Sequence, residues 1–144
     1  MSDEFCRLPG DHGSENDVIR RMTSARRIAV VGLSDDPSKP SFGVAAYLRS
    51  VGKEIVPVNP KYRAVMGLPC YPSLEAVPGK IDLVDVFRRP EFCPEVARSA
   101  AVIGASGLWL QLGIVSPEAQ TIAQAAGLDF VQDRCIKVEH MFLV

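Results

Sequence analysis

Short apolar runs that alternate with helix-like segments are the feature that most constrains how this chain can fold. The runs are continuous rather than alternating, which is typical of parallel strands buried on both faces. They lie at residues 27–31, 54–58, 82–87, 107–111 and 129–131. Apolar residues recurring every third or fourth position predict helices before and between the runs, near residues 15–25, 41–51, 94–103 and 117–126.

Strands and helices in this order predict right-handed βαβ units within one α/β domain. The expected fold is a single Rossmann-like, doubly wound domain over residues 14–144, with a mainly parallel five-stranded sheet and helices on both faces. Ser14 or Asn16 is suited to cap the first helix. We expect a 3-2-1-4-5 strand order, in which a ligand crevice lies between the first and fourth strands. Pro57 weakens the second strand only if that strand is central on its donor side.

Charge and composition exclude several classes of protein. A net charge of −1 provides no overall field for nucleic acid or another polyanion, so any anion must be bound locally. No apolar run approaches the roughly 20 residues that span a bilayer. Residues 1–13 are interpreted as a flexible N-terminal arm and lack the basic and apolar regions of a signal peptide. We therefore expect a cytoplasmic protein that binds neither membrane nor nucleic acid.

The cysteines are scattered along the chain, with no CxxC pair and no histidine at metal spacing beside them. They are Cys6, Cys70, Cys93 and Cys135. This pattern predicts reduced thiols that fill core or loop space, and no metal site. A reactive thiol is the alternative.

The loop after the first run carries the first candidate ligand-binding residues. A glycine at a strand end lets the backbone approach a phosphate, and the next helix N-terminus offers free N–H groups. Hydroxyl and ammonium groups can complete such an anion site. The candidates are Gly32, Leu33, Ser34, Lys39 and Ser41. The loop departs from G-x-G-x-x-G and is longer and richer in proline, so an ordinary turn is the alternative.

The segment after the second run discriminates better between ligands. A NAD-binding domain usually has a carboxylate here, which accepts a hydrogen bond from the ribose 2′-hydroxyl. This chain has Asn59, Pro60 and Lys61, then Arg63, and no acid. Two cations favour a phosphate on the ribose, either the 2′-phosphate of NADP or the 3′-phosphate of coenzyme A. A solvated basic loop is the alternative.

Two arginines leave the third run together. Either Arg88 or Arg89 can bind a pyrophosphate, pair with Glu91 or contact a dimer partner. After the fourth run, Gln111 can hydrogen-bond an amide such as that of pantetheine, and Gly113 permits close approach of a ligand.

Other residues with distinctive chemistry are expected to be structural. Trp109 is expected in the core rather than as a platform for a ligand. His140 lies in a charged stretch after the last run and is expected to be a satisfied residue rather than a catalyst. No serine or cysteine has a histidine and an acid beside it in sequence.

Six segments in order resemble the stand-alone CoA-binding domain family, and they cover about residues 20–140. The segments are RRIAVVGLSDDPSKPS, IVPVNPKY, GLPCYPSL, DLVDVFRRPE, GLWLQLGI and QDRCIKVEH. That family is also similar to the nucleotide-binding domain of the succinyl-CoA synthetase α subunit. The resemblance implies a Rossmann fold that binds coenzyme A at the carboxyl ends of the strands. On matching positions it points to Gly32, Ser34, Lys39, Asn59, Pro60, Lys61, Val86, Phe87, Arg88, Gln111 and Gly113.

The resemblance also implies a function, namely binding of coenzyme A or acyl-CoA by a non-catalytic or regulatory module. Neither the phosphohistidine domain nor the ATP-grasp module of the synthetases has a counterpart in this sequence, so we expect no catalysis by this chain alone. An NADP-linked reductase and an accessory subunit of an acyl-CoA-using enzyme are the alternatives. The expected partner is the small molecule, with a homodimer or a partner enzyme as further options.

Overall fold

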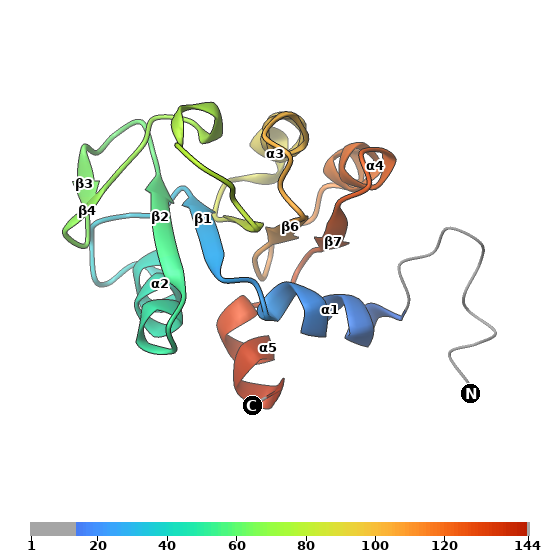
Figure 1. Ribbon diagram of the computed structural model, residues 1–144, viewed down its shortest axis with the longest axis horizontal. Helices are drawn as coiled ribbons and strands as arrows, with labels where there is room; N and C mark the ends of the chain where they lie inside the picture. Colours follow the sequence, from blue (N-terminus) through green and yellow to red (C-terminus); the bar gives the residue numbers. More distant parts are fainter. Residues whose placement is uncertain (1–13, 144) are drawn as a thin grey trace.

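A five-stranded parallel sheet carries the candidate residues. The computed structural model describes residues 14–143. The strands lie side by side in the order β2-β1-β5-β6-β7 (Figure 1). They are β1 (Arg27–Val31), β2 (Glu54–Val58), β5 (Leu83–Val86), β6 (Gly107–Leu110) and β7 (Asp129–Val131).

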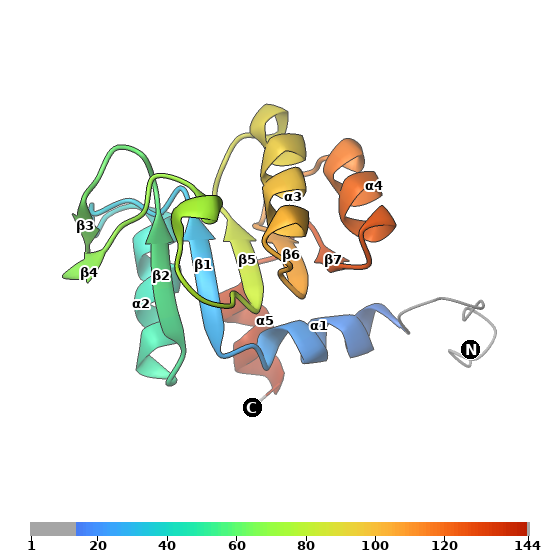
Figure 2. The same ribbon diagram turned by 45° about the horizontal axis from the view of Figure 1, so that its top comes forward.

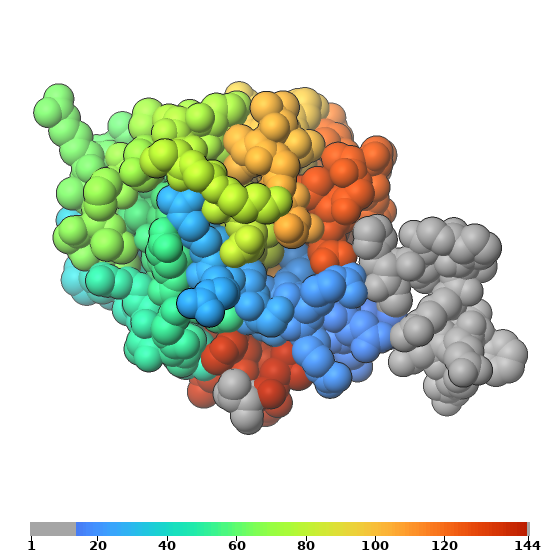
Figure 3. All heavy atoms as spheres, in the orientation of Figure 1, coloured from blue at the N-terminus to red at the C-terminus, as the bar shows by residue number. Residues whose placement is uncertain are grey.

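Helices cover both faces of this sheet. One face carries α3 (Cys93–Val102), α4 (Pro117–Ala125) and the short helix η2 (Leu74–Ala76), and the other carries α1 (Glu15–Thr23), α2 (Pro40–Ser50) and α5 (Ile136–Leu143). The space-filling view shows α5 at the bottom of the molecule, beside α1 and α2 (Figure 3). Successive strand residues serve opposite cores: Val84 belongs to the core under α3 and α4, whereas Leu83 belongs to the other core.

The predicted fold class is confirmed. Each predicted strand begins and ends within one residue of an observed strand, because a continuous apolar run ends where the chain leaves the buried sheet. Ser14 is the residue that caps α1, and its hydroxyl oxygen accepts a hydrogen bond of 3.2 Å from the Asp17 N–H. The N-terminal arm predicted for residues 1–13 lies outside the described residues.

The expected 3-2-1-4-5 strand order is wrong, because β5 pairs with β1 and leaves β2 at the edge of the sheet. Pro57 gives a physical reason. The Val58 carbonyl faces β1 and accepts from Gly32 N–H at 2.9 Å, whereas the Pro57 carbonyl faces outward and accepts from Tyr71 N–H at 3.0 Å. The donor that proline lacks therefore falls on the outer side of an edge strand, where it is tolerated. The winding reverses between β1 and β5, and the crevice lies there rather than beside β6.

A hairpin and the last helix were not predicted from the sequence, nor were the short helices η2 and η3 (Pro90–Phe92). The small hairpin consists of β3 (Ala64–Val65) and β4 (Leu68–Pro69). The last helix is α5, whose start is bonded to the end of β6. Trp109 Nε1 donates to the Arg134 carbonyl at 2.8 Å, and Gln111 Oε1 accepts from Ile136 N–H at 3.2 Å. Trp109 is fully buried, as expected for a core residue.

Within residues 14–143, every helix is too short or too polar to cross a membrane.

Candidate functional site

A cavity of about 480 Å³ opens at the carboxyl ends of β1, β2 and β5, beside the point where the winding reverses. The strands all point toward this edge of the sheet (Figure 2). Apolar side chains from strand ends and from α3 form part of the lining, including Val31, Val58 and Val96. In open α/β sheets, ligands bind in this kind of crevice. The cavity is therefore the candidate site.

The structure brings six of the predicted residues together in this cavity. They are Gly32, Asn59, Pro60, Lys61, Phe87 and Arg88, and they come from the ends of three strands. The other seven predicted residues do not line it: Leu33, Ser34, Lys39, Ser41, Val86, Gln111 and Gly113.

The fold requires glycine at position 32, whether or not a ligand is bound. Its φ of +85° is a conformation that side chains rarely adopt, and a Cβ there would lie 2.5 Å from the Phe87 carbonyl oxygen. The end of β1 and the end of β5 therefore approach each other more closely than any other residue type would allow. This contact forms the floor of the cavity before any ligand is considered.

The Asn59 side chain joins the loop after β1 to the loop after β2 by hydrogen bonds. Its Nδ2 donates to the Leu33 carbonyl at 3.1 Å, and its Oδ1 accepts from the Lys61 N–H at 3.0 Å. Both ends of the amide are thus bonded within the chain. Asn59 holds the backbone of Lys61 in place and leaves the lysine side chain free.

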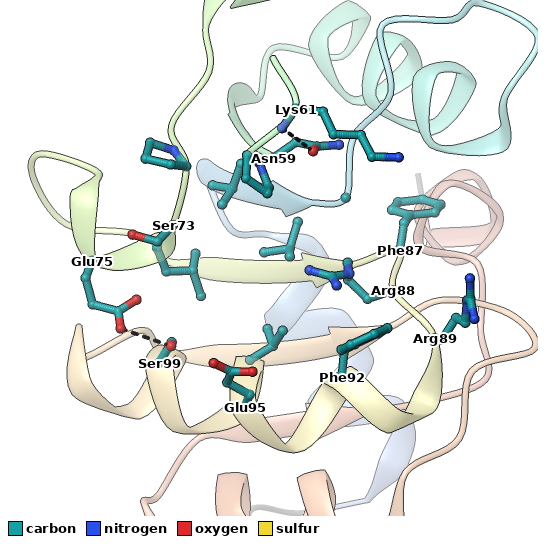
Figure 4. A pocket seen from close by; sticks show the side chains of 17 residues that line it. Asn59, Lys61, Ser73, Glu75, Phe87, Arg88, Arg89, Phe92, Glu95 and Ser99 are labelled. Carbon is teal, nitrogen blue, oxygen red and sulfur yellow. Dashed lines mark hydrogen bonds between the residues drawn. The ribbon is translucent and has the colours of Figure 1, made fainter. Parts of the chain in front are cut away.

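Lys61 and Arg88 form the cationic end of the cavity (Figure 4). Within residues 14–143, neither head group forms an ion pair or a side-chain hydrogen bond. Arg88 instead lies over the Phe92 ring, with its guanidinium carbon 4.4 Å from the ring centroid. Arg89 differs, because it is largely exposed and lies 3.6 Å from a Glu91 carboxylate oxygen.

The loop after β1 is organised, but it is directed toward the β3–β4 hairpin. Asp35 Oδ1 accepts from the Met66 N–H at 2.9 Å, and Ser41 Oγ accepts from the Ser34 N–H at 3.0 Å. Leu33 is fully buried in the core beside α2. The phosphate cradle predicted for this loop is therefore not part of the cavity lining, apart from Gly32.

Gln111 and Gly113 are engaged by the C-terminal segment. Gln111 is buried and caps α5, as described above, and Gly113 N–H donates to Asp133 Oδ1 at 2.7 Å. Val86 is fully buried under α3. The groups predicted to meet a pantetheine amide are therefore already hydrogen-bonded within the chain.

Sequence reasoning missed the far end of the cavity, which α3 and the segment around η2 supply. Its polar residues are Ser73, Glu75, Glu95 and Ser99, and Phe92 lies beside Arg88. Ser99 Oγ donates to Glu75 Oε2 at 3.1 Å. The close view shows Glu75 on the side of the cavity away from Lys61 and Arg88, and Glu95 between Ser99 and Phe92 (Figure 4). The i, i+3, i+7 spacing of Phe92, Glu95 and Ser99, along α3 and the residue before it, is a signal that could have identified one wall.

His140 and the thiols of Cys70, Cys93 and Cys135 lie outside the lining of this cavity, and Cys6 lies outside the described residues. Burial raises the pKa of the Cys93 thiol to about 11, and burial also raises the pKa of Cys70, so both thiols are unreactive at neutral pH. His140 Nδ1 lies 2.7 Å from the Tyr47 hydroxyl, and burial lowers the pKa of this histidine. Residues 14–143 contain no cluster of three metal-ligating side chains.

The family model described as CoA binding domain matches residues 26–141, and the chain therefore belongs to this family. The match includes every strand of the sheet and every predicted site residue.

Individual relatives agree with this assignment. The uncharacterized protein YneT of Bacillus subtilis is 39% identical over 127 residues, which are 88% of this chain and 94% of YneT. A hypothetical protein from Pyrococcus horikoshii OT3 has a similar structure, with a TM-score of 0.86, 37% identity and coverage of 95% and 96% of the two chains. The ADP-forming acetate–CoA ligase I of Archaeoglobus fulgidus is 26% identical over 129 residues, which are 82% of this chain but 19% of the ligase. The chain thus spans about a fifth of that ligase.

Proposed function

We propose that this chain binds coenzyme A, free or acylated, in the cavity at the ends of β1, β2 and β5. The observation that carries the proposal is the pair of cations, Lys61 and Arg88, which face the cavity without an anionic partner among the described residues. An unpaired guanidinium has five N–H donors available for phosphate oxygens, and an ammonium has three. Membership of the CoA binding domain family supports coenzyme A as the anion.

The lining supports a particular placement of the ligand. Arg88, at the end of β5, is suited to the pyrophosphate, because a planar guanidinium matches phosphate oxygens in pairs. Lys61, at the end of β2, is suited to the 3′-phosphate on the ribose. The apolar residues Val31, Leu74 and Val96 offer a surface for the adenine ring.

NADP is the rival ligand, because its 2′-phosphate would suit the same pair of cations. Isothermal titration calorimetry of the purified chain with coenzyme A, 3′-dephospho-CoA and NADP separates the two. We expect coenzyme A to bind about tenfold more tightly than 3′-dephospho-CoA, the effect of one charge-assisted phosphate contact. Tighter binding of NADP would move the chain to the reductase class, and no binding of coenzyme A would overturn the proposal.

We also propose that the domain binds coenzyme A without converting it, as a regulatory or accessory module. The match supports this, because residues 26–141 correspond to a CoA binding domain and the aligned region is about a fifth of the acetate–CoA ligase. The test is an assay for acetyl-CoA with the chain, ATP, coenzyme A and acetate, run beside a thermal melt. Coenzyme A at ~100 times Kd should add about 2.7 kcal/mol of stability, while no thioester forms. ATP-dependent acetyl-CoA formation would contradict the proposal.

A further inference from the structure

We infer that Phe92 is a positioning residue that holds the Arg88 guanidinium in place to bind the pyrophosphate of the ligand. The inference rests on the proposed coenzyme A site and assigns a role within it to a residue that contacts Arg88. Phe92 lies at the end of the short helix η3 (Pro90–Phe92), directly before α3.

Packing contacts hold the Arg88 side chain in place. Its guanidinium carbon lies 4.4 Å from the centroid of the Phe92 ring. Its Cδ lies beside Gly32, at the floor of the cavity: a Cβ added at Gly32 would be 3.3 Å from this atom. The distal part of the side chain, from Cδ to the guanidinium, is therefore held by packing rather than by hydrogen bonds.

This packing leaves the N–H donors and the charge of Arg88 available. Stacking engages the face of the guanidinium, whereas its N–H donors lie in the plane and point outward. A carboxylate partner would fix the same head group but would occupy those donors and cancel its charge. Arg88 is half-buried and has no such partner among residues 14–143, so the charge and the donors remain available to a phosphate.

Arg89, the next residue along the chain, has a different environment. Arg89 has 81% of its side chain exposed and lies beside the Glu91 carboxylate. Arg89 also lines the cavity, but no ring lies under its guanidinium and its charge is partly matched by Glu91. Of the two adjacent arginines, Arg88 is therefore the one suited to the pyrophosphate.

The test is a double-mutant cycle with coenzyme A, measured by calorimetry. Phe92→Leu keeps an apolar side chain but removes the ring, and we expect about a three- to tenfold loss of affinity, as the loss of a cation–π contact allows. Phe92→Tyr retains the ring face and should stay within about twofold of the wild type. In an Arg88→Met background, Phe92→Leu should cause no further loss. An equal loss in that background would mean that the ring contacts the ligand itself and would overturn the inference, as would an unchanged affinity in Phe92→Leu alone.

A second measurement separates this inference from the proposed function. The Arg88 Nε–H signal, followed by NMR in the ligand-free protein, should carry a ring-current shift that Phe92→Leu removes and Phe92→Tyr keeps. Titration with inorganic pyrophosphate should then move this signal in the wild type more strongly than in Phe92→Leu. If coenzyme A does not bind but pyrophosphate gives this pattern, the proposed ligand is wrong and the positioning role stands. A signal that is unchanged in Phe92→Leu would overturn the role itself.

Discussion

Arg27 at the amino edge of the sheet and Arg88 at its carboxyl edge hold the same head group in opposite ways. Arg27 Nε donates to Glu54 Oε2 at 2.6 Å, and its NH1 donates to the carbonyls of Pro78 and Lys80 at 2.9 and 3.0 Å. Arg88 donates no side-chain hydrogen bond within residues 14–143 and stacks on a ring. Three hydrogen bonds from Arg27 join segments of the fold, whereas the N–H donors of Arg88 make none within residues 14–143 and are available to a ligand. The comparison predicts which edge serves stability and which serves binding.

The largest expected effect on stability lies at Gly32, which is at the carboxyl edge of the sheet and is nevertheless needed for the fold. Gly32→Val should lower the free energy of unfolding by about 3 to 5 kcal/mol, because it combines a strained positive φ with overpacking against the Phe87 carbonyl. Urea denaturation measures the loss. Gly52→Val is the matched control, since Gly52 has φ +93° and nothing within 4 Å of an added Cβ. Equal losses in the two variants would show that the contact with Phe87 contributes nothing.

Between the two edges, Asp85 lies in the middle of β5 with both carboxylate oxygens buried and unbonded. Burial raises its pKa well above the usual range for a carboxyl group. The unfolded chain releases this proton in the usual acidic range while the folded chain keeps it. The contribution of Asp85 to stability is therefore full at low pH and is lost as pH rises toward the folded pKa, by about 1.4 kcal/mol per pH unit.

Asp85→Asn removes this titration and should be more stable than the wild type at neutral pH, with a difference that grows between pH 5 and 7. Urea denaturation across that range checks it. Asp36→Asn is the control, because hydrogen bonds from the backbone and hydroxyl of Ser38 lower the pKa of Asp36. Its contribution to stability is present throughout pH 5 to 7 and is lost only at more acidic pH, so the difference for this variant should stay constant over that range. A difference for Asp85→Asn that does not change with pH would mean that Asp85 ionises in the folded protein as it does in the unfolded chain.

Arg27→Met tests the amino edge. It removes three hydrogen bonds that join β1 to β2 and to the segment before β5, and we expect a loss of about 2 kcal/mol of stability. The affinity for coenzyme A should stay within about twofold, since Arg27 lies at the opposite edge from the cavity. Denaturation and calorimetry on the same preparation give both numbers. A large loss of affinity in a folded variant would remove the distinction between the edges.

Arg88→Met should show the converse pattern. The stem of the side chain is kept and the charge is lost, so we expect at least about a tenfold loss of affinity for coenzyme A. Its melting temperature should be almost unchanged, because no hydrogen bond within residues 14–143 depends on the guanidinium. A marked fall in the melting temperature with unchanged affinity would make Arg88 a structural residue like Arg27.

The ends of the strands could be predicted from the sequence, whereas contacts between distant segments could not. Strand ends were predictable because apolar runs stop at the sheet edge, and this placed Gly32, Lys61 and Arg88 correctly at the carboxyl ends of their strands. The lateral order of the strands is not encoded in periodicity. Pro57 is a signal for an edge strand that the expected 3-2-1-4-5 order did not use. The internal partners of Gln111 could not be predicted, because they depend on α5 folding back from far along the chain. Phe92 was missed because its spacing with Glu95 and Ser99 indicates a shared helix face but does not show that the ring lies beside Arg88.

The smallest expected effect concerns Lys61 and is the most specific to the ligand. Its ammonium is exposed, so solvent screens it, and its loss should cost less than that of Arg88. Lys61→Ala should nevertheless shrink the preference for coenzyme A over 3′-dephospho-CoA from about tenfold to about threefold or less. Affinity for 3′-dephospho-CoA itself should hardly change, because that ligand lacks the phosphate that Lys61 is proposed to bind. Arg63→Ala is the matched control, since Arg63 is a nearby exposed cation on the same loop that does not line the cavity. Calorimetry with both ligands gives the ratio, and an equal loss for the two would assign Lys61 to the pyrophosphate rather than to the 3′-phosphate.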